Sequence, residues 1–351
     1  MMDINALLHF SIVAIKQENP SARTYELKLL NDGKLQFKAG QFLTFLINTE
    51  NHDIRRSYSI LSLPGEPIKI TVKKVENGAI SRFILQTWKI GDIVYSLPPA
   101  GRFTVEPWKT YKRDIFCFAA GSGIIPILPQ IKYLLNAEPQ SIIHLIYSNK
   151  DEDNSLFLEE IETLDQRYDN LQLLNFFSDP GNRVKERGRL SNLNVEPLIE
   201  KLLQFKKEDA LFLICGPFAY MRMLNFVLML MHFPKENIRR ENFLPEIMRA
   251  GQAVHKLFPE RQIILTLTGQ TSKVEVRPGE DILSAAQRQG LNPPYSCKGG
   301  ICGNCAAKCK SGKVYMSINE VLTEADLQQG WVLTCTGFPE TENVMIDFRD
   351  S

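Results

Sequence analysis

Hydrophobic and polar residues alternate along the first hundred positions. Segments 24–29 (Thr-Tyr-Glu-Leu-Lys-Leu) and 68–72 (Ile-Lys-Ile-Thr-Val) place apolar side chains at every second position, which is the period of a half-buried β-strand. Gly, Pro and Asn residues separate such segments and indicate turns. The pattern predicts a barrel or sandwich of short antiparallel strands between residue 12 and about residue 103.

From residue 114 the alternation gives way to continuous apolar runs. They occupy residues 115–120, 142–147, 171–177 and 211–214. Strands that are covered on both faces of a parallel sheet have this character, and helical stretches such as 156–164 lie between the runs. The middle of the chain is therefore predicted to be an α/β domain.

The hydrophobic pattern changes after residue 243 and marks another domain boundary. Pro245, Gly251 and Pro259 fall in a stretch without periodicity, which is typical of a linker. Beyond it, segments 263–267 and 273–276 are spaced as a hairpin, and 281–289 follows as a short helix. The chain is thus predicted to be a multidomain α+β protein. Its parts are an antiparallel β-barrel at 1–108, a parallel-sheet α/β domain at 109–243, a linker at 244–260 and a third domain at 261–351.

Charge and hydropathy exclude several classes of partner. The chain has 41 basic and 40 acidic residues, a balance that argues against nucleic acid as a partner. Its first ten residues lack a secretory signal, so we expect a cytoplasmic location. The most apolar helical stretch, 220–233, contains Arg222 and Asn225 and is too short to span a bilayer. We expect a buried helix there and no membrane association.

Five of the seven cysteines fall in one region, whereas Cys117 and Cys215 stand alone. An odd count in a cytosolic chain argues against a disulfide framework. Four cysteines follow the C-x4-C-x2-C…C spacing of plant-type two-iron, two-sulfur clusters, with 29 residues before the last: Cys297, Cys302, Cys305 and Cys335. Glycines at 299, 300 and 303 allow the backbone N–H groups to approach the sulfur atoms.

Zinc is the competing interpretation, because a C-x2-C knuckle with two further cysteines can form a tetrahedral site. The usual zinc pattern has two separated pairs and not three ligands within nine residues, which favours the cluster. Cys309 is a surplus thiol, which we interpret as structural or incidental.

Two further motifs suit a flavin and a dinucleotide. In Arg56-Ser57-Tyr58-Ser59, a guanidinium can pair with a pyrophosphate, a phenol ring can lie on an isoalloxazine, and a hydroxyl can reach its N5 edge. Gly121-Ser122-Gly123, followed by Pro126, lies between a buried strand and a helix, where backbone N–H groups bind phosphate. An ordinary strand with an exposed Arg and an ordinary strand–helix turn are the alternatives.

These motifs resemble the ferredoxin–NADP reductase superfamily with a C-terminal plant-type ferredoxin domain of the β-grasp fold. Pro294-Tyr295-Ser296-Cys297 and Leu333-Thr334-Cys335-Thr336 carry the ferredoxin likeness. In domain order the chain resembles the reductases of oxygenase systems, such as the phenylacetyl-CoA epoxidase reductase subunits, and the hybrid-cluster protein reductases. The resemblance implies FAD, with FMN the less favoured flavin.

The resemblance also implies further site residues. Lys74, Gly78 and Ser81 would lie near the flavin phosphates. Cys215-Gly216-Pro217 with Met221 matches a C-G-P-x-x-M motif that faces the nicotinamide, and Glu241 and Phe243 match an acidic and aromatic ending near the flavin. Ser59, Cys215 and Glu241 are the implied catalytic residues. For Cys215 a buried thiol before a turn is the alternative, and for Glu241 and Phe243 a packing contact; His144, inside an apolar strand, is predicted to be a core histidine.

Together these parts predict an electron-transfer circuit. A nicotinamide gives up two electrons as a hydride, whereas an iron-sulfur cluster accepts one electron at a time. A flavin can take up two electrons together and pass them on singly. We expect an NAD(P)H-dependent reductase that passes electrons through FAD and a 2Fe-2S cluster to a partner protein, an oxygenase or hydroxylase. A redox-sensing protein, and an autonomous NAD(P)H oxidase or quinone reductase, are the alternatives.

The choice between NADPH and NADH depends on a turn after the second buried run. Lys150, Arg187 and Arg189 could pair with a 2′-phosphate and slightly favour NADPH. Asp151, Glu152 and Asp153 follow Lys150 at once, and a salt-bridged surface turn explains these residues equally well.

Overall fold

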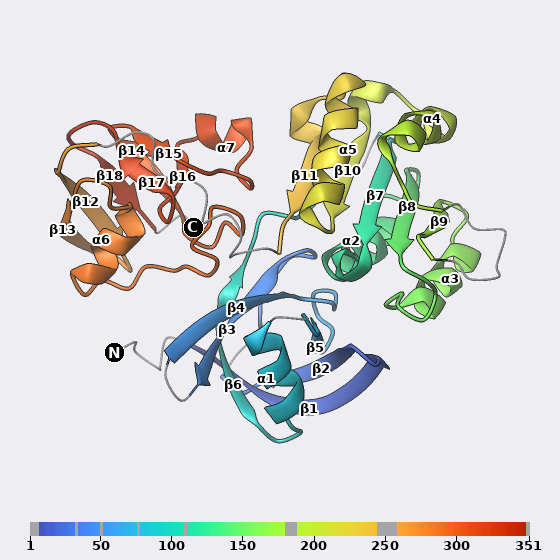
Figure 1. The fold of residues 1–351 in the computed structure, drawn as a ribbon, viewed down its shortest axis with the longest axis horizontal. Helices are drawn as coiled ribbons and strands as arrows, with labels where there is room; N and C mark the ends of the chain where they lie inside the picture. Colours follow the sequence, from blue (N-terminus) through green and yellow to red (C-terminus); the bar gives the residue numbers. More distant parts are fainter. Residues whose placement is uncertain are drawn as a thin grey trace.

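The computed structural model describes residues 7–31, 34–49, 52–75, 78–108, 111–179, 188–243 and 258–348. Three bodies follow one another along the chain, each built on its own sheet (Figure 1). The sheets fall within 8–100, 114–241 and 261–347. The predicted linker lies largely outside the described residues.

The first body is an antiparallel sheet in the order β4-β3-β6-β1-β2-β5. Its elements are β1 (Leu8–Asn19), β2 (Ala22–Leu29), β3 (Phe42–Thr49), β4 (His52–Ser59), β5 (Ile68–Lys73), α1 (Ala79–Thr87) and β6 (Ile93–Ala100). The alternating side chains fill a core around Tyr25, Phe45 and Ile84. Ile60, just after β4, bridges Ile70 of β5, so the sheet curls round this core. The predicted antiparallel fold is confirmed.

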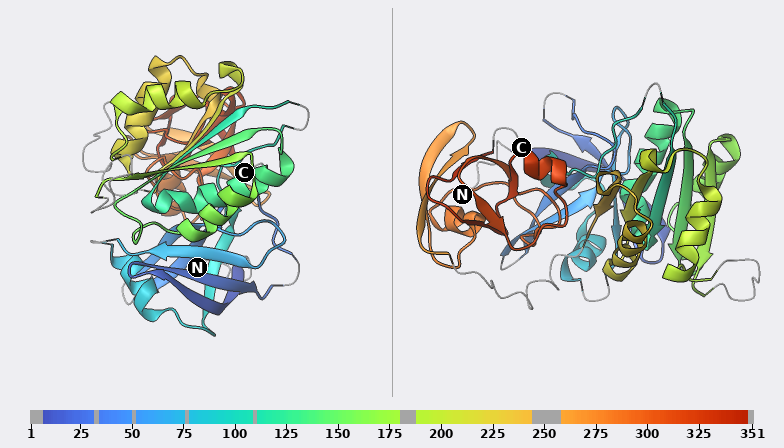
Figure 2. Two further views of the ribbon diagram at one scale, coloured as in Figure 1. Left: turned by 90° about the vertical axis from the view of Figure 1, so that its right-hand side faces the viewer. Right: turned by 90° about the horizontal axis from the view of Figure 1, so that it is seen from above.

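The second body is a five-stranded parallel sheet in the order β11-β10-β7-β8-β9. The strands are β7 (Asp114–Ala120), β8 (Ile142–Asn149), β9 (Leu171–Phe177), β10 (Leu211–Cys215) and β11 (Ile238–Glu241). Helices α2 (Ile124–Ala137) and α3 (Leu158–Arg167) cover one face; α4 (Asn192–Leu202) and α5 (Phe218–Leu230) cover the other (Figures 1 and 2). Short 3₁₀ turns lie at Gly121–Gly123, Lys207–Asp209 and Lys235–Asn237. The continuous apolar runs are the strands buried between these layers.

One expectation about this body was wrong. Helix α5 was expected to be buried, but Phe226, Met229 and Leu230 are exposed while Leu224 and Leu228 enter the core. A helix on the outer face of a sheet buries one stripe, so apolar residues elsewhere on it stay in contact with solvent. No helix of the described residues is long and apolar enough to cross a membrane.

The third body is a mixed sheet in the order β13-β12-β18-β14-β16, with a separate β15-β17 pair. Its elements are β12 (Arg261–Leu267), β13 (Gln270–Val276), α6 (Ile282–Arg288), β14 (Ala306–Ser311), β15 (Val314–Met316), α7 (Glu324–Gln328), β16 (Trp331–Leu333), β17 (Gly337–Pro339) and β18 (Met345–Asp347). The predicted hairpin is β12–β13. Ala285 and Ala286 of α6 pack into the sheet's core, as expected for a β-grasp fold.

His144 is a core residue, as predicted. Its side chain is fully buried; Nε2 lies 3.0 Å from Asp114 Oδ1, and Nδ1 lies 3.2 Å from Gln172 Oε1. The other carboxylate oxygen of Asp114 accepts hydrogen bonds from the backbone N–H groups of Gln204 and Phe205, at 2.9 and 2.7 Å. One carboxylate therefore joins β7, β8 and the segment after α4.

Replacing Asp114 by Ala should destabilise the parallel-sheet domain by about 3 kcal/mol, because the imidazole and two backbone donors lose their acceptor. Chemical denaturation followed by fluorescence measures this change. Asp179→Ala is the control, because Asp179 makes an exposed ion pair with Lys150, and such pairs contribute roughly 0–1 kcal/mol. Equal effects of the two substitutions would contradict the prediction.

Candidate active site

The predicted dinucleotide motifs meet where the strand order of the parallel sheet reverses. From β7 the chain continues to β8 and β9 on one side, whereas β10 lies on the other side of β7. The loops that leave β7 and β10 therefore diverge, and ligands of open α/β sheets bind in the crevice that results. Gly121–Gly123 follows β7, and Cys215 ends β10 in register with Ala119.

Glycine is required at this crevice because the two loops touch. A Cβ atom on Gly123 would lie 2.0 Å from the carbonyl oxygen of Cys215, and one on Gly216 would lie 2.8 Å from Cβ of Ala120. Gly121 has a φ of +54°, a conformation that other residues rarely adopt. The turn with Ser122 leads into α2, whose first N–H groups suit a phosphate. Pro126 lies in the first turn, where no N–H donor is needed.

Lys73 reaches the same loop from the barrel and was missed as a site residue. Its Nζ atom lies 3.6 Å from the position that a Cβ on Gly121 would take. Burial lowers the pKa of this ammonium group below its ordinary value. Only its place at the start of the Lys73–Ser81 stretch could have drawn attention to it. A half-buried cation beside a glycine turn at the start of a helix favours an anionic ligand.

Cys215 and Glu241 lie side by side, at the carboxyl ends of β10 and β11. Burial raises the pKa of the Cys215 thiol, and the charge of Glu241 raises it further. Burial also raises the pKa of Glu241 to about 8, so its carboxyl group is protonated at neutral pH. Among the residues that the structure describes, Glu241 Oε2 has no hydrogen-bond partner, as expected for a polar group that meets a ligand.

Ser59, the third implied catalytic residue, is buried at the end of β4. Within the described part of the chain, no hydrogen bond joins Ser59 to Cys215 or Glu241. The structure therefore brings two of the three residues together, and the part of Ser59 stays a prediction.

The R-S-Y-S motif occupies β4. Arg56 and Tyr58 are register partners of Phe45 and Leu43 on β3, both of which are core residues. Burial raises the pKa of Tyr58, which keeps the phenol neutral. Ser57, also predicted to contact a cofactor, pairs with Thr44, and side chains alternate between the two faces of a strand. Its hydroxyl lies 2.7 Å from Ser296 Oγ in the third body.

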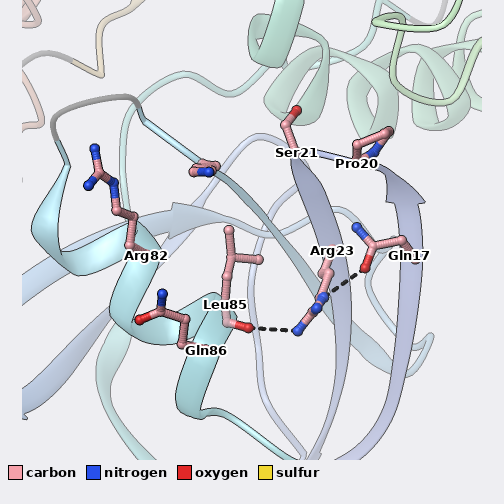
Figure 3. A pocket seen from close by; sticks show the side chains of 8 residues that line it. Gln17, Pro20, Ser21, Arg23, Arg82, Leu85 and Gln86 are labelled. Atoms are coloured by element: carbon pink, nitrogen blue, oxygen red, sulfur yellow. Dashed lines mark hydrogen bonds between the residues drawn. The ribbon is translucent and has the colours of Figure 1, made fainter.

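A basic pocket of about 480 Å³ lies beside α1 (Figure 3). Lys74, Arg23 and Arg82 line it, and Arg23 is held by Gln17 Oε1 at 2.7 Å and by the carbonyl of Leu85 at 2.6 Å. Such charge suits a phosphate group. The location of Lys74 thus fits its predicted role.

Gly78 and Ser81 shape the turn before α1. Ser81 Oγ accepts a hydrogen bond from the Val75 N–H at 3.0 Å and donates one to the Gly78 carbonyl at 3.3 Å. A Cβ atom on Gly78 would lie 2.8 Å from Cβ of Val75. Both residues stabilise the turn, and their contact with flavin phosphates stays a prediction.

Met221, Pro217 and Phe243 complete the predicted set. Met221 is buried in the core of the parallel-sheet body, Pro217 caps α5, and Phe243 is 40% exposed. Cofactor contacts of these three residues stay predictions. The exposed ring of Phe243, two residues after Glu241, is accessible to a ligand.

The four predicted cluster ligands come together in the third body. Cys305 Sγ lies 3.2 Å from Cys335 Sγ. Hydrogen bonds from the thiols of Cys302 and Cys335 lower the pKa of Cys297, and the Gly299 N–H lies 3.3 Å from its sulfur atom. Cys309 is separate from this group, because its thiol is bonded to the Ser311 carbonyl at 3.2 Å.

The donor set fits a two-iron cluster. Each iron of such a cluster takes two thiolates, so ligands in two pairs suit it, and backbone N–H groups directed at sulfur offset its negative charge. Gly300 and Gly303 both have a φ of +73°, and a Cβ on Gly300 would lie 2.6 Å from the Ile318 carbonyl oxygen.

The turn after β8 supports the surface-turn alternative for the candidate 2′-phosphate residues. Lys150 Nζ lies 3.9 Å from Asp179 Oδ2, with both side chains exposed. Asp151 Oδ1 accepts hydrogen bonds from the backbone and side chain of Asn154. Arg189 is exposed, and Arg187 lies outside the described residues.

Three family models match the chain in order. They are an oxidoreductase FAD-binding domain over residues 9–105, an oxidoreductase NAD-binding domain over 118–225, and a 2Fe-2S iron-sulfur cluster binding domain over 265–340. They overlap the three sheets and contain the R-S-Y-S strand, the Gly121–Gly123 turn and the four cysteines. FAD, NAD(P)H and a 2Fe-2S cluster are therefore the cofactors, which favours the cluster over zinc.

Curated relatives carry the same organisation. The chain is 33% identical to a component of the 1,2-phenylacetyl-CoA epoxidase of Escherichia coli over 89% of each chain. It is 29% identical to the ferredoxin reductase component of the 3-ketosteroid-9-alpha-monooxygenase of Mycobacterium tuberculosis, over 90% of this chain and 87% of the relative.

Solved structures show the same fold. Phthalate dioxygenase reductase superposes with a TM-score of 0.59 and 21% identity over 98% of both chains. An intact type IV self-sufficient cytochrome P450 monooxygenase gives 0.73 at 17% identity, over 98% of this chain and 41% of that one.

Replacing Lys73 by Met should raise KM for the nicotinamide nucleotide about tenfold with little change in kcat, because a charge-assisted contact with phosphate is lost from a binding site. Steady-state kinetics with ferricyanide as acceptor measures both constants. Lys69→Met is the matched control on β5, because Lys69 pairs with Glu26 at 3.7 Å. An unchanged KM in the Lys73 variant would contradict the assignment.

Glu241→Gln should remove a pH dependence of stability. The folded state keeps the carboxyl proton up to about pH 8, whereas the unfolded chain loses it near the ordinary value of 4.5. Because the folded state binds more protons in this window, stability falls as the pH rises. Thermal unfolding of the flavin-free protein should be measured between pH 5 and 8.5. As the pH rises, the melting temperature of the native protein should fall relative to that of the variant. Parallel pH profiles for the two proteins would refute this.

Proposed function

The chain belongs to the family of oxygenase reductase components that combine FAD-binding, NAD-binding and 2Fe-2S domains, and on this premise we propose that it delivers electrons from NAD(P)H to an oxygenase or hydroxylase protein. It is an FAD- and NAD(P)H-dependent oxidoreductase of the ferredoxin reductase type. One contact carries the proposal. The 2.7 Å hydrogen bond between Ser57 and Ser296 places the cysteine loop against the R-S-Y-S strand.

Bound FAD supplies the conversion between a two-electron donor and a one-electron acceptor. The chain's own residues bind and orient the cofactors. Arg56, Lys74 and the pocket beside α1 bind flavin phosphates, while Lys73 and the Gly121–Gly123 turn bind the phosphates of the nucleotide. Cys215 fills the end of β10 and excludes water. Glu241 holds a proton at its carboxyl group beside the nicotinamide.

The relatives support the choice of acceptor. The two relatives described above are components of an epoxidase and a monooxygenase. A third relative, at 26% identity, is the reductase subunit of the Pseudomonas aeruginosa glycine betaine monooxygenase. We place the chain in the cytoplasm, because the three cysteines outside the cluster loop and its last ligand, Cys117, Cys215 and Cys309, are free thiols and thiols stay reduced there.

Replacing Cys302 by Ser tests the route of the electrons. The variant should keep NAD(P)H-dependent reduction of ferricyanide, which a flavin supports alone, and lose most of its reduction of cytochrome c. Loss of one of four cluster ligands removes the one-electron carrier. Cys309→Ser is the matched control, because the Cys309 thiol lies outside the ligand group.

The two alternative functions predict other outcomes. An autonomous oxidase or quinone reductase would reduce its substrate equally well after the Cys302 substitution. A redox sensor would show a cluster that NAD(P)H bleaches, with negligible turnover of either dye. Steady cytochrome c reduction by the native protein and by the Cys309 variant, but not by the Cys302 variant, supports the reductase.

A further inference from the structure

Four polar side chains form a continuous row across the contact between the barrel and the third body. Asn304 Nδ2 donates to Thr44 Oγ1 at 3.2 Å. Thr44 Oγ1 lies 2.9 Å from Ser57 Oγ, which in turn lies 2.7 Å from Ser296 Oγ. Thr44 is 1% exposed and Asn304 is 8% exposed. Ser57 and Ser296 are half-buried. The Asn304–Thr44 end of the row is therefore shielded from water, which strengthens its hydrogen bond.

The two ends of the row lie beside cluster ligands. Ser296 precedes Cys297, and Asn304 precedes Cys305. The middle of the row lies on the strands of the flavin site, since Ser57 separates Arg56 from Tyr58 on β4 and Thr44 is its partner on β3. Two points of the ligand loop are thus fixed to one pair of barrel residues.

We propose that Thr44 and Ser57 are positioning residues, whose hydroxyl groups hold the cysteine loop at a fixed place on the flavin-binding strands and so set the rate of electron transfer from flavin to cluster. The inference rests on the proposed function, because the rate exists only if electrons take this route. In this proposal the hydroxyl groups of Thr44 and Ser57 act only by positioning the loop and do not contact the reacting atoms.

Other contacts between the two bodies differ in kind. The guanidinium carbon of Arg55 lies 3.8 Å from the centre of the Tyr295 ring, and Arg102 pairs with Asp326. Long side chains can follow a displaced partner by changing rotamer. The hydroxyl oxygen of Ser or Thr lies only two bonds from Cα and moves only by rotation about χ1. The row of short side chains therefore fixes the relative position of the two bodies more tightly than the long side chains do.

Thr44 lies at the centre of the row. A hydroxyl group donates one hydrogen bond and accepts two. Thr44 can therefore accept from the Asn304 amide and also share a hydrogen bond with Ser57, which in turn bonds Ser296. Removing the Thr44 hydroxyl therefore breaks the row at its centre and leaves a buried amide without its acceptor.

The test is stopped-flow reduction of the holoprotein by NADPH, with flavin bleaching and cluster reduction followed separately. Thr44→Val preserves shape and removes the hydroxyl. It should leave the rate of flavin reduction unchanged and slow cluster reduction about tenfold, the effect of losing one or two ordinary hydrogen bonds from a docked state. Ser57→Ala should slow cluster reduction by a similar factor, and Thr44→Ser should restore the native rate.

Thr71→Val is the matched control. Thr71 makes a buried hydroxyl contact of 2.8 Å with Thr24 in the same barrel, between β2 and β5, away from the row. This variant loses a comparable hydrogen bond and should keep both rates. Hydrogen exchange supplies a second readout, in which residues 294–305 should exchange faster in the Thr44→Val variant than in the control.

Native flavin-to-cluster rates in Thr44→Val and Ser57→Ala would overturn the inference while leaving the reductase function intact. Loss of the cluster from Thr44→Val, measured by iron and sulfide content, would also overturn it, because the row would then support the loop itself and not its position. A native protein whose cluster NADPH fails to reduce would refute the proposed function.

Discussion

The contact between the cysteine loop and strand β4 is the feature on which the arrangement depends. A hydride donor, a flavin and an iron-sulfur cluster can exchange electrons only if their reactive parts approach one another, yet three separately folded bodies hold them. Ser296 of the loop and Ser57 of β4 lie 2.7 Å apart, and Lys73 of the barrel reaches the Gly121 turn. The barrel therefore contacts the functional loop of each of the other two bodies.

Burial then sets the chemistry within each body. In the parallel sheet, Gly123 and Gly216 let the loops after β7 and β10 approach each other without side chains between them. Glu241 ends the neighbouring strand β11 and keeps its proton because charge is costly where the side chain is buried. In the third body the backbone turns toward sulfur, which suits an anionic cluster. The same principle, a site shaped before its ligand arrives, applies in both places.

The sequence predicts those features that depend on residues close together in the chain. The spacing of Cys297, Cys302 and Cys305 reflects a single loop, and the Gly121–Gly123 turn reflects one strand–helix junction. Ser57 shows the limit, because its hydroxyl meets a residue 239 positions away and no local pattern specifies that pairing. Lys73 was missed for the same reason. Helix α5 was misjudged because composition gives its hydrophobicity, whereas the exposure of Phe226 depends on what covers it.

The central claim is that electrons from a nicotinamide nucleotide reach the cluster through this one polypeptide. Electron paramagnetic resonance of the anaerobic holoprotein mixed with NADPH tests it most directly. The account predicts a signal from a one-electron-reduced 2Fe-2S cluster that accounts for most of the bound iron. A bleached flavin beside a cluster that stays oxidised and silent would contradict the account.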